Sequence, residues 1–178
     1  MIETERLILR SWREADQAPF HAICADPQVM ATLGPVMDRA QSDALILRVR
    51  ATEAAHGMTF WAMERKADGA LLGWCGLIPG AEGTPIAGED EIGWRLGSAY
   101  WGLGYAREAA EATLDWGWHV RGSREIAAIT AAVNRRSWAL MDRLGMVRAA
   151  DQDFDHPKVP PDSALRPHIT YRIKKPIG

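Results

Sequence analysis

The stretch EIGWRLGSAYWGLGYAREA, residues 91–109, carries the strongest structural signal in this sequence. It predicts a strand over residues 89–96, a tight glycine turn over residues 102–104 and a helix that begins at Tyr105. The first N–H groups of a helix have no acceptor within the helix, and they lie at the positive end of its dipole. A strand, a turn and a helix in this order therefore predict an anion site at the turn.

Small residues make this turn open to a phosphate. Gly102, Gly104 and Ala106 leave room for a phosphate to approach the backbone, and Arg107 adds a nearby cation. A P-loop is excluded because no lysine follows the glycines, and the dinucleotide fingerprint fails because Arg107 stands at its third small position. Two interpretations stay open from the turn alone: a cradle for the diphosphate of coenzyme A, and glycines that serve only packing at a helix N-terminus.

A second informative segment surrounds Asn134. This residue stands between a predicted strand, 125–133, and a predicted helix, 135–144, which is an N-cap position. Asn134 therefore caps the helix or turns toward a ligand. Ser137 falls in the first helical turn, where its hydroxyl faces either solvent or the same ligand.

The rest of the chain completes a mixed α/β (α+β) pattern in one domain, residues 1–178. A capping box at Ser11 to Glu14 predicts that the first helix opens at Ser11. Further elements are predicted as strands at 4–10, 59–65, 71–78, 146–150 and 169–174, and as helices running toward Cys24, over 39–55 and over 105–120. The proline-containing stretch 151–168 carries no regular pattern.

Composition excludes several classes of protein. The chain has 178 residues, 47% of them apolar, and a net charge of −2, so we expect a globular protein without the basic field that nucleic-acid binding needs. Its two cysteines form no CxxC pair, so we expect no metal site, and a reducing cytoplasm is the simplest location. The N-terminus lacks a signal-peptide layout, and no apolar run is long enough to span a membrane.

Taken together and in order, five segments resemble the GNAT acyltransferase superfamily, and most closely its RimJ/RimL-type branch, which acetylates the N-termini of ribosomal proteins. The resemblance covers nearly the whole chain, and it is carried by residues 4–10, 91–94, 100–106, 134–137 and 144–146. It implies a three-layer fold whose central, mostly antiparallel sheet is splayed after residues 92–96 and flanked by helices. Acetyl-CoA would lie in that opening as co-substrate.

The resemblance also assigns residues to the cofactor. Backbone groups of residues 94–96 would pair with the pantetheine arm, residues 101–107 would hold the pyrophosphate, and Asn134 would reach the pantetheine. In the family's phosphate motif Q/R-x-x-G-x-G/A, Gly104 and Ala106 match, while a tryptophan occupies the Q/R place. The whole set is Trp94, Arg95, Leu96, Trp101, Gly102, Leu103, Gly104, Tyr105, Ala106, Arg107, Asn134 and Ser137.

Acyl transfer to an amine needs an unprotonated amine, stabilisation of charge on the carbonyl oxygen, and a proton for the leaving thiolate. Glu91 is the leading candidate for the base, directly or through a water, although a strand-end carboxylate paired with an arginine is an equal alternative. A backbone N–H near Trp94 or Arg95 would meet the oxygen. Ser137, as the branch suggests, would protonate the thiolate, and Tyr105 is a weaker alternative.

These observations predict an acetyl-CoA-dependent N-acetyltransferase. The acceptor would be a primary amine, either a protein N-terminus or a small molecule. The alternative is a non-catalytic acyl-CoA-binding sensor, which would share the phosphate turn and Asn134 but make no use of Glu91 and Ser137. We expect no nucleic-acid or membrane partner, and the sequence leaves the oligomeric state open, a homodimer included.

Overall fold

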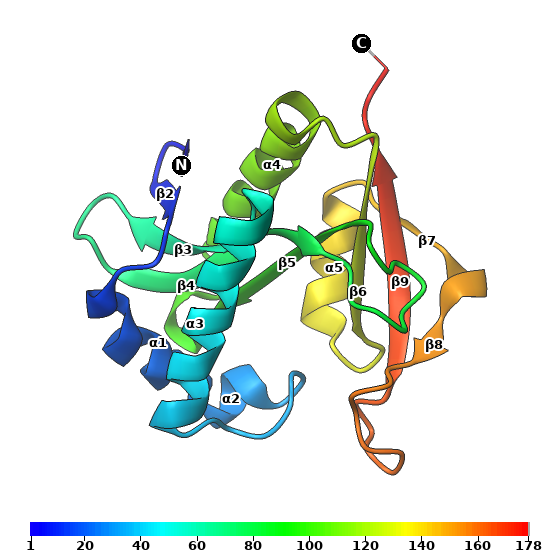
Figure 1. Cartoon of the computed structure of the whole chain (residues 1–178), viewed down its shortest axis with the longest axis horizontal. Helices are drawn as coiled ribbons and strands as arrows, with labels where there is room; N and C mark the ends of the chain where they lie inside the picture. Colours follow the sequence, from blue (N-terminus) through cyan, green and yellow to red (C-terminus); the bar gives the residue numbers. More distant parts are fainter. Residues whose placement is uncertain (178) are drawn as a thin grey trace.

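A mixed β-sheet runs through the molecule, and the computed structural model describes it over residues 1–177 (Figure 1). Within that range nine strands join in the order β1-β2-β3-β4-β5-β6-β9-β7, and β8 pairs with β9. Neighbouring strands are antiparallel except β5 and β6, which run parallel. The strands are β1 (Ile2–Glu3), β2 (Leu7–Arg10), β3 (Phe60–Arg65), β4 (Leu71–Pro79), β5 (Asp90–Leu96), β6 (Glu125–Ala131), β7 (Val147–Arg148), β8 (Phe154–Asp155) and β9 (Pro167–Lys174).

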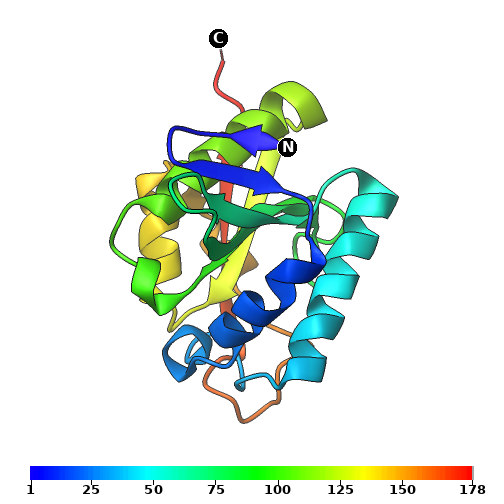
Figure 2. The ribbon, with the colours of Figure 1, turned by 90° about the vertical axis from the view of Figure 1, so that its left-hand side faces the viewer.

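Helices cover both faces of this sheet. They are α1 (Gln17–Cys24), α2 (Pro27–Met30), α3 (Arg39–His56), α4 (Tyr105–Trp116) and α5 (Arg135–Arg143). Figure 2 shows α1 and α3, in blue and cyan, on one side of the sheet, and α4 and α5, in light green and yellow, on the other. None of the helices in residues 1–177 has the length and apolar character needed to cross a membrane.

Two hydrophobic cores hold the layers together. On the α1–α3 side, Phe20, Leu45 and Val49 pack against Trp74 of β4. On the other side, α4 packs against β4 and β5, and α5 packs against β6. Because β4 is covered on both faces, its residues 71–77 are all buried, and its sequence is apolar without alternation. The predicted fold class, a mixed sheet in a three-layer arrangement flanked by helices, is confirmed.

Most predicted elements are present, and the differences have local causes. The first helix does not open at Ser11, because the Ser11 hydroxyl donates to Glu53 on α3 instead of capping a helix. Glu14–Asp16 forms a 3₁₀ turn, and α1 begins only at Gln17. The short elements β1 and α2 were not predicted, and the stretch 151–168 contains a 3₁₀ turn and β8.

The parallel pair β5 and β6 separates almost as soon as it forms. Its register contains one bridge, between Glu91 and Ala127, while β5 pairs with β4 along the whole length of β5 and β6 pairs with β9 over seven residues. Beyond the bridge the two strands diverge (Figure 1). The sheet is therefore splayed between β5 and β6 from the start of β5 onward, whereas the resemblance implied a splay after residues 92–96, and an opening lies between its two parts.

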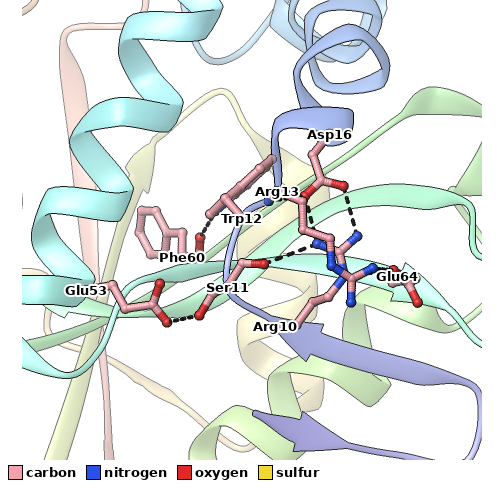
Figure 3. A network of polar contacts seen from close by, with 8 residues as sticks. All are labelled: Arg10, Ser11, Trp12, Arg13, Asp16, Glu53, Phe60 and Glu64. Carbon is pink, nitrogen blue, oxygen red and sulfur yellow. Dashed lines mark hydrogen bonds and ion pairs between the residues drawn. The ribbon is translucent and has the colours of Figure 1, made fainter.

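A buried ion-pair network fixes the chain between β2 and α1 (Figure 3). Arg10 donates two hydrogen bonds to Asp16, at 2.7 and 2.8 Å, and one to Glu64 of β3 at 2.7 Å. Asp16 also accepts from the backbone N–H of Arg13. Burial alone would raise the pKa of Asp16, but the hydrogen bonds from Arg10 and Arg13 hold it below its usual value. The carboxylate is therefore charged, and it ties the start of α1 to the sheet.

Replacing Asp16 with asparagine should destabilise the protein by about 3 kcal/mol, because removing one partner leaves the Arg10 guanidinium buried with part of its charge unpaired. Urea unfolding measures this loss. Asp43→Asn is the matched control, since Asp43 pairs with Arg39 on the exposed face of α3 and its loss should cost only about 0.5 kcal/mol. Equal effects of the two substitutions would show that the network does not hold the helix.

Candidate active site

A cavity of about 680 Å³ lies where β5 ends and the two parts of the sheet separate. Its size is typical of a small-molecule site. The wall is built by α2 and the residues after it, by the end of β5, by the glycine turn and by α5. Of the residues that the sequence assigned to a cofactor, these line it: Trp94, Arg95, Leu96, Trp101, Gly102, Ala106, Asn134 and Ser137.

The glycine turn has the backbone geometry that only glycine adopts easily. Gly102 and Gly104 have φ angles of +75° and +84°, and Gly104 is the N-cap of α4. Among the described residues, no protein oxygen accepts a hydrogen bond from the backbone N–H groups of residues 102–106. These groups point out of the helix start with the dipole behind them, so they can bind an anion such as a diphosphate.

Trp101 stands where the family's phosphate motif has Gln or Arg, and the structure shows what it does there. Its indole N–H donates to the carbonyl oxygen of Leu96 at 3.0 Å, which closes the turn against the end of β5. The guanidinium carbon of Arg136 lies 4.2 Å from the centre of the Trp101 ring. A cation from α5 thus lies beside the turn, where the motif residue itself supplies none.

The charged residues that line the cavity in the described part of the chain are all basic. Arg95, Arg135, Arg136 and Arg143 contribute to the lining, and no Asp or Glu of the described chain does. Such a wall favours a polyanionic ligand. Arg107, in contrast, lies outside the lining and pairs with Glu111 on the exposed face of α4 at 2.8 Å.

Asn134 and Ser137 meet at the start of α5. The Asn134 side-chain oxygen accepts from the Ser137 backbone N–H at 3.3 Å, and its amide donates to Thr130 at 3.1 Å. Asn134 therefore caps α5, as its position in the sequence indicated, and it lines the cavity as well. The half-buried hydroxyl of Ser137 also faces this cavity wall.

Glu91 lies at the point of separation, outside the cavity lining. It pairs with Ile78 on one side and bridges Ala127 on the other. Burial raises the pKa of its carboxyl from 4.5 to about 7. No ion-pair partner of Glu91 is present in residues 1–177, whereas the neighbouring Glu89 and Asp90 pair with arginines. Pairing with an arginine, the alternative role considered for Glu91, is therefore found for Glu89 and Asp90 instead.

Leu103, Gly104 and Tyr105 also lie outside the lining. Leu103 is exposed, and its carbonyl oxygen accepts from Arg6 at 3.0 Å. Tyr105 is buried in the core with the Arg6 guanidinium 4.4 Å above its ring. Its hydroxyl is therefore held away from the cavity wall, unlike that of Ser137.

Two parts of the wall were missed by sequence reasoning. Residues 28–33, in α2 and the turn after it, carry no motif. Arg136, Leu140 and Arg143 are spaced by four and three residues, so their common face on α5 is a signal that the sequence contained.

Comparison with known proteins shows that the chain matches a protein family. Residues 6–147 match the family model described as the acetyltransferase (GNAT) domain. The chain is also 33% identical over 145 residues to the uncharacterized protein YkkB of Bacillus subtilis (strain 168), covering 80% of this chain and 83% of that protein.

Solved structures agree in fold. An acetyltransferase from Agrobacterium tumefaciens str. C58 superposes with a TM-score of 0.78 at 25% identity, covering 98% of this chain and 94% of the other. RimJ of Mycobacterium smegmatis, solved in complex with CoA-disulfide, superposes with a TM-score of 0.73 at 22% identity, covering 94% of this chain and 81% of the other. At that identity RimJ shares the fold, and its ligand is a property of RimJ.

The raised pKa of Glu91 has a consequence for stability. Its carboxyl ionises less readily in the folded chain, so the wild type loses stability as the pH rises from about 4.5 through about 7. Glu91→Gln lacks this loss, so its melting temperature relative to wild type should be more favourable at pH 8 than at pH 5. Calorimetry at the two pH values tests this, with Glu82→Gln in an exposed loop as control. A pH-independent difference would place the Glu91 pKa near its ordinary value.

Proposed function

The chain belongs to the GNAT acetyltransferase family and is an acyltransferase enzyme, and we propose that it transfers the acetyl group of acetyl-CoA to a primary amine by direct attack of the amine on the thioester. The observation that carries this proposal is the separation of β5 from β6 beyond the Glu91–Ala127 bridge, with a cavity at its outer end. An extended pantetheine arm fits such an opening, because the edge of β5 that faces β6 has backbone groups without a strand partner.

Residues of this chain fit each part of the co-substrate. The free N–H groups of residues 102–106 suit the diphosphate, and Arg135, Arg136 and Arg143 suit the remaining phosphate charge. The backbone of Trp94, Arg95 and Leu96 would pair with the pantetheine, and Asn134 would contact it while it caps α5. Bound acetyl-CoA supplies an activated carbonyl and a thiolate leaving group.

Glu91 is the proposed base. A pKa of about 7 means that roughly half of the carboxyl groups are ionised at neutral pH and can accept a proton. Glu91 precedes Trp94 by three residues, or about 10 Å of extended strand, so it acts on an amine near the inner end of the opening or through a water. An α-amine, with a pKa of about 7.7–8.0, needs less help than a lysine at about 10.4.

The other two steps fall to groups near the end of β5. A backbone N–H of Trp94 or Arg95 would donate to the carbonyl oxygen as negative charge develops on it. Ser137 would give its proton to the departing thiolate, since its hydroxyl is the one of the two proposed acids that faces the cavity wall.

The acceptor belongs to one of two classes of primary amine. The resemblance to the RimJ/RimL type supports a protein N-terminus, and a small primary amine is the other candidate. Both cysteines of the described chain are buried and unpaired, which suits action in a reducing cytoplasm.

The first experiment tests for acetyl transfer and for the role of Glu91 as the base. Release of CoA thiol is measured with a panel of peptides and small amines, and acetylated acceptors are identified by mass spectrometry. Glu91→Gln should lower kcat/KM by about 10²-fold. The ratio of wild-type to variant rate should rise with pH through about 7, because only the wild type gains a base there and the ionisation of the amine is common to both. A constant ratio would show that Glu91 does not accept the proton. An absence of turnover with every amine would contradict the proposed acetyl transfer.

The second experiment addresses the diphosphate cradle. Valine at Gly102 would place a β-branched side chain on the cavity wall, where the Cβ position is open, so CoA binding should weaken by about 100-fold through lost charge-assisted hydrogen bonds. Calorimetric titration with CoA measures this effect. Gly69→Val is the control, because Gly69 has a similar φ of +71° and open space around its Cβ position, but lies in a distant turn. Unchanged CoA affinity in Gly102→Val would show that the phosphate does not bind at this turn.

A further inference from the structure

Arg95 is one of the residues that line the cavity, and its guanidinium has no carboxylate to balance its charge in residues 1–177. Its Nη1 donates to the sulfur of Cys24 at 3.2 Å, a weak acceptor, and its guanidinium carbon lies 4.8 Å from the centre of the Trp74 ring. Its Nε is buried and has no hydrogen-bond partner. In residues 1–177 no Asp or Glu oxygen lies within 4.0 Å of this guanidinium.

Two other shielded arginines of the chain have acidic partners. Arg10 pairs with Asp16 and Glu64, and Arg172 pairs with Glu89 and Glu125. A buried charge without a partner lowers stability, so a fold that pairs its other shielded arginines has a reason to leave one unpaired.

The surroundings of Arg95 increase this imbalance. Burial raises the pKa of the Cys24 thiol, so Cys24 is neutral and offers no counter-charge. The nearby Arg48 of α3 adds further positive potential. Desolvation lowers the pKa of Arg95 from its ordinary value, but an arginine starts so high that it stays charged at neutral pH.

The position of Arg95 separates it from the proposed phosphate site. Side chains alternate along β5, and a Cβ at Gly93 would meet the ring of Phe60 on the α1–α3 side. Arg95 shares that face, with Cys24 of α1 and Trp74 beside it. Trp94 and Leu96 take the opposite face and pack with the α4–α5 core. The arginines of α5 that suit phosphate thus lie across β5 from the Arg95 side chain.

We propose that the Arg95 guanidinium binds a carboxylate of the acceptor amine. The inference rests on the proposed function and narrows its substrate class to amines that carry an anionic group. A planar guanidinium binds a carboxylate through two parallel hydrogen bonds, and the Trp74 ring fixes the plane of this one. Polyamines, which bring only positive charge, are excluded as good acceptors.

The carboxylate has two sources, and the test separates them. The first pair of acceptors is L-phenylalanine and L-phenylalaninamide, which differ in the α-carboxylate. The second pair is the C-terminally amidated peptides Asp-Ala-Ala and Asn-Ala-Ala, which differ only in a side-chain carboxylate next to the N-terminal amine. The wild type should prefer the carboxylate member of at least one pair, and that pair identifies the source.

Arg95→Gln should abolish this preference. We expect kcat/KM for the carboxylate acceptor to fall by about 10- to 100-fold, mainly through KM, as expected for a lost hydrogen bond to a charged group, while KM for acetyl-CoA stays unchanged. Arg50→Gln is the control, because Arg50 is exposed on α3 and away from the cavity. A raised KM for acetyl-CoA with an unchanged preference among acceptors would assign Arg95 to the cofactor and overturn the proposal.

Binding and stability keep the inference testable without turnover. Calorimetric titration of the CoA-loaded protein with the same four acceptors should show carboxylate-dependent binding that Arg95→Gln removes, and this result would stand even if no acetyl transfer were found. The melting temperature of Arg95→Gln should equal or exceed that of the wild type, because an unbalanced buried charge is removed. A lower melting temperature, or equal binding of both members in both pairs, would show that Arg95 serves packing instead.

Discussion

A single bridge between Glu91 and Ala127 joins the two parts of the sheet, and the rest of the site depends on the separation that follows it. A parallel pair that continued would satisfy the backbone of β5 and fill the space with neighbouring side chains. Because the pair stops after one bridge, β5 is paired with β4 on one edge and left open on the other. This edge, the free amides of the glycine turn and the start of α5 border one cavity, so the fold itself creates the opening in which the candidate site lies.

Charge is distributed in the same way on both faces of β5. On the α4–α5 side, Arg135, Arg136 and Arg143 line the cavity with no acidic residue among them. On the α1–α3 side, Arg95 stands without a carboxylate. Arg10 and Arg172, which are also shielded, pair with carboxylates, so in residues 1–177 the shielded arginine without a counter-charge is the one in the cavity lining. The structure thus places the α5 arginines and the Arg95 side chain on opposite faces of the strand that carries Glu91.

The sequence predicted the parts of the fold that depend on local signals. Residues 91–109 predicted β5, the turn and α4, because glycines with positive φ and an apolar strand leave few alternatives. The predicted start of α1 was wrong because the Ser11 hydroxyl donates a hydrogen bond to Glu53, which is distant in the sequence. The wall formed by α2 was missed for a related reason. A four-residue helix has too few positions for a periodic pattern, and only the tertiary structure brings it to the cavity. Likewise, no local signal shows that Arg95 lacks a partner.

The N-terminal helices connect stability to the site. The Arg10–Asp16 pair fixes the start of α1, and the other end of α1 carries Cys24, which contacts Arg95. Two residues later the Asp26 carboxylate accepts from Ser98, directly after β5, and caps α2. The same segment therefore holds α2, which lines the cavity, against β5 and the residues after it. The α1–α2 segment is therefore anchored to β5 and the residues after it by side chains that are distant in the sequence, which explains why no short motif predicts this wall of the cavity.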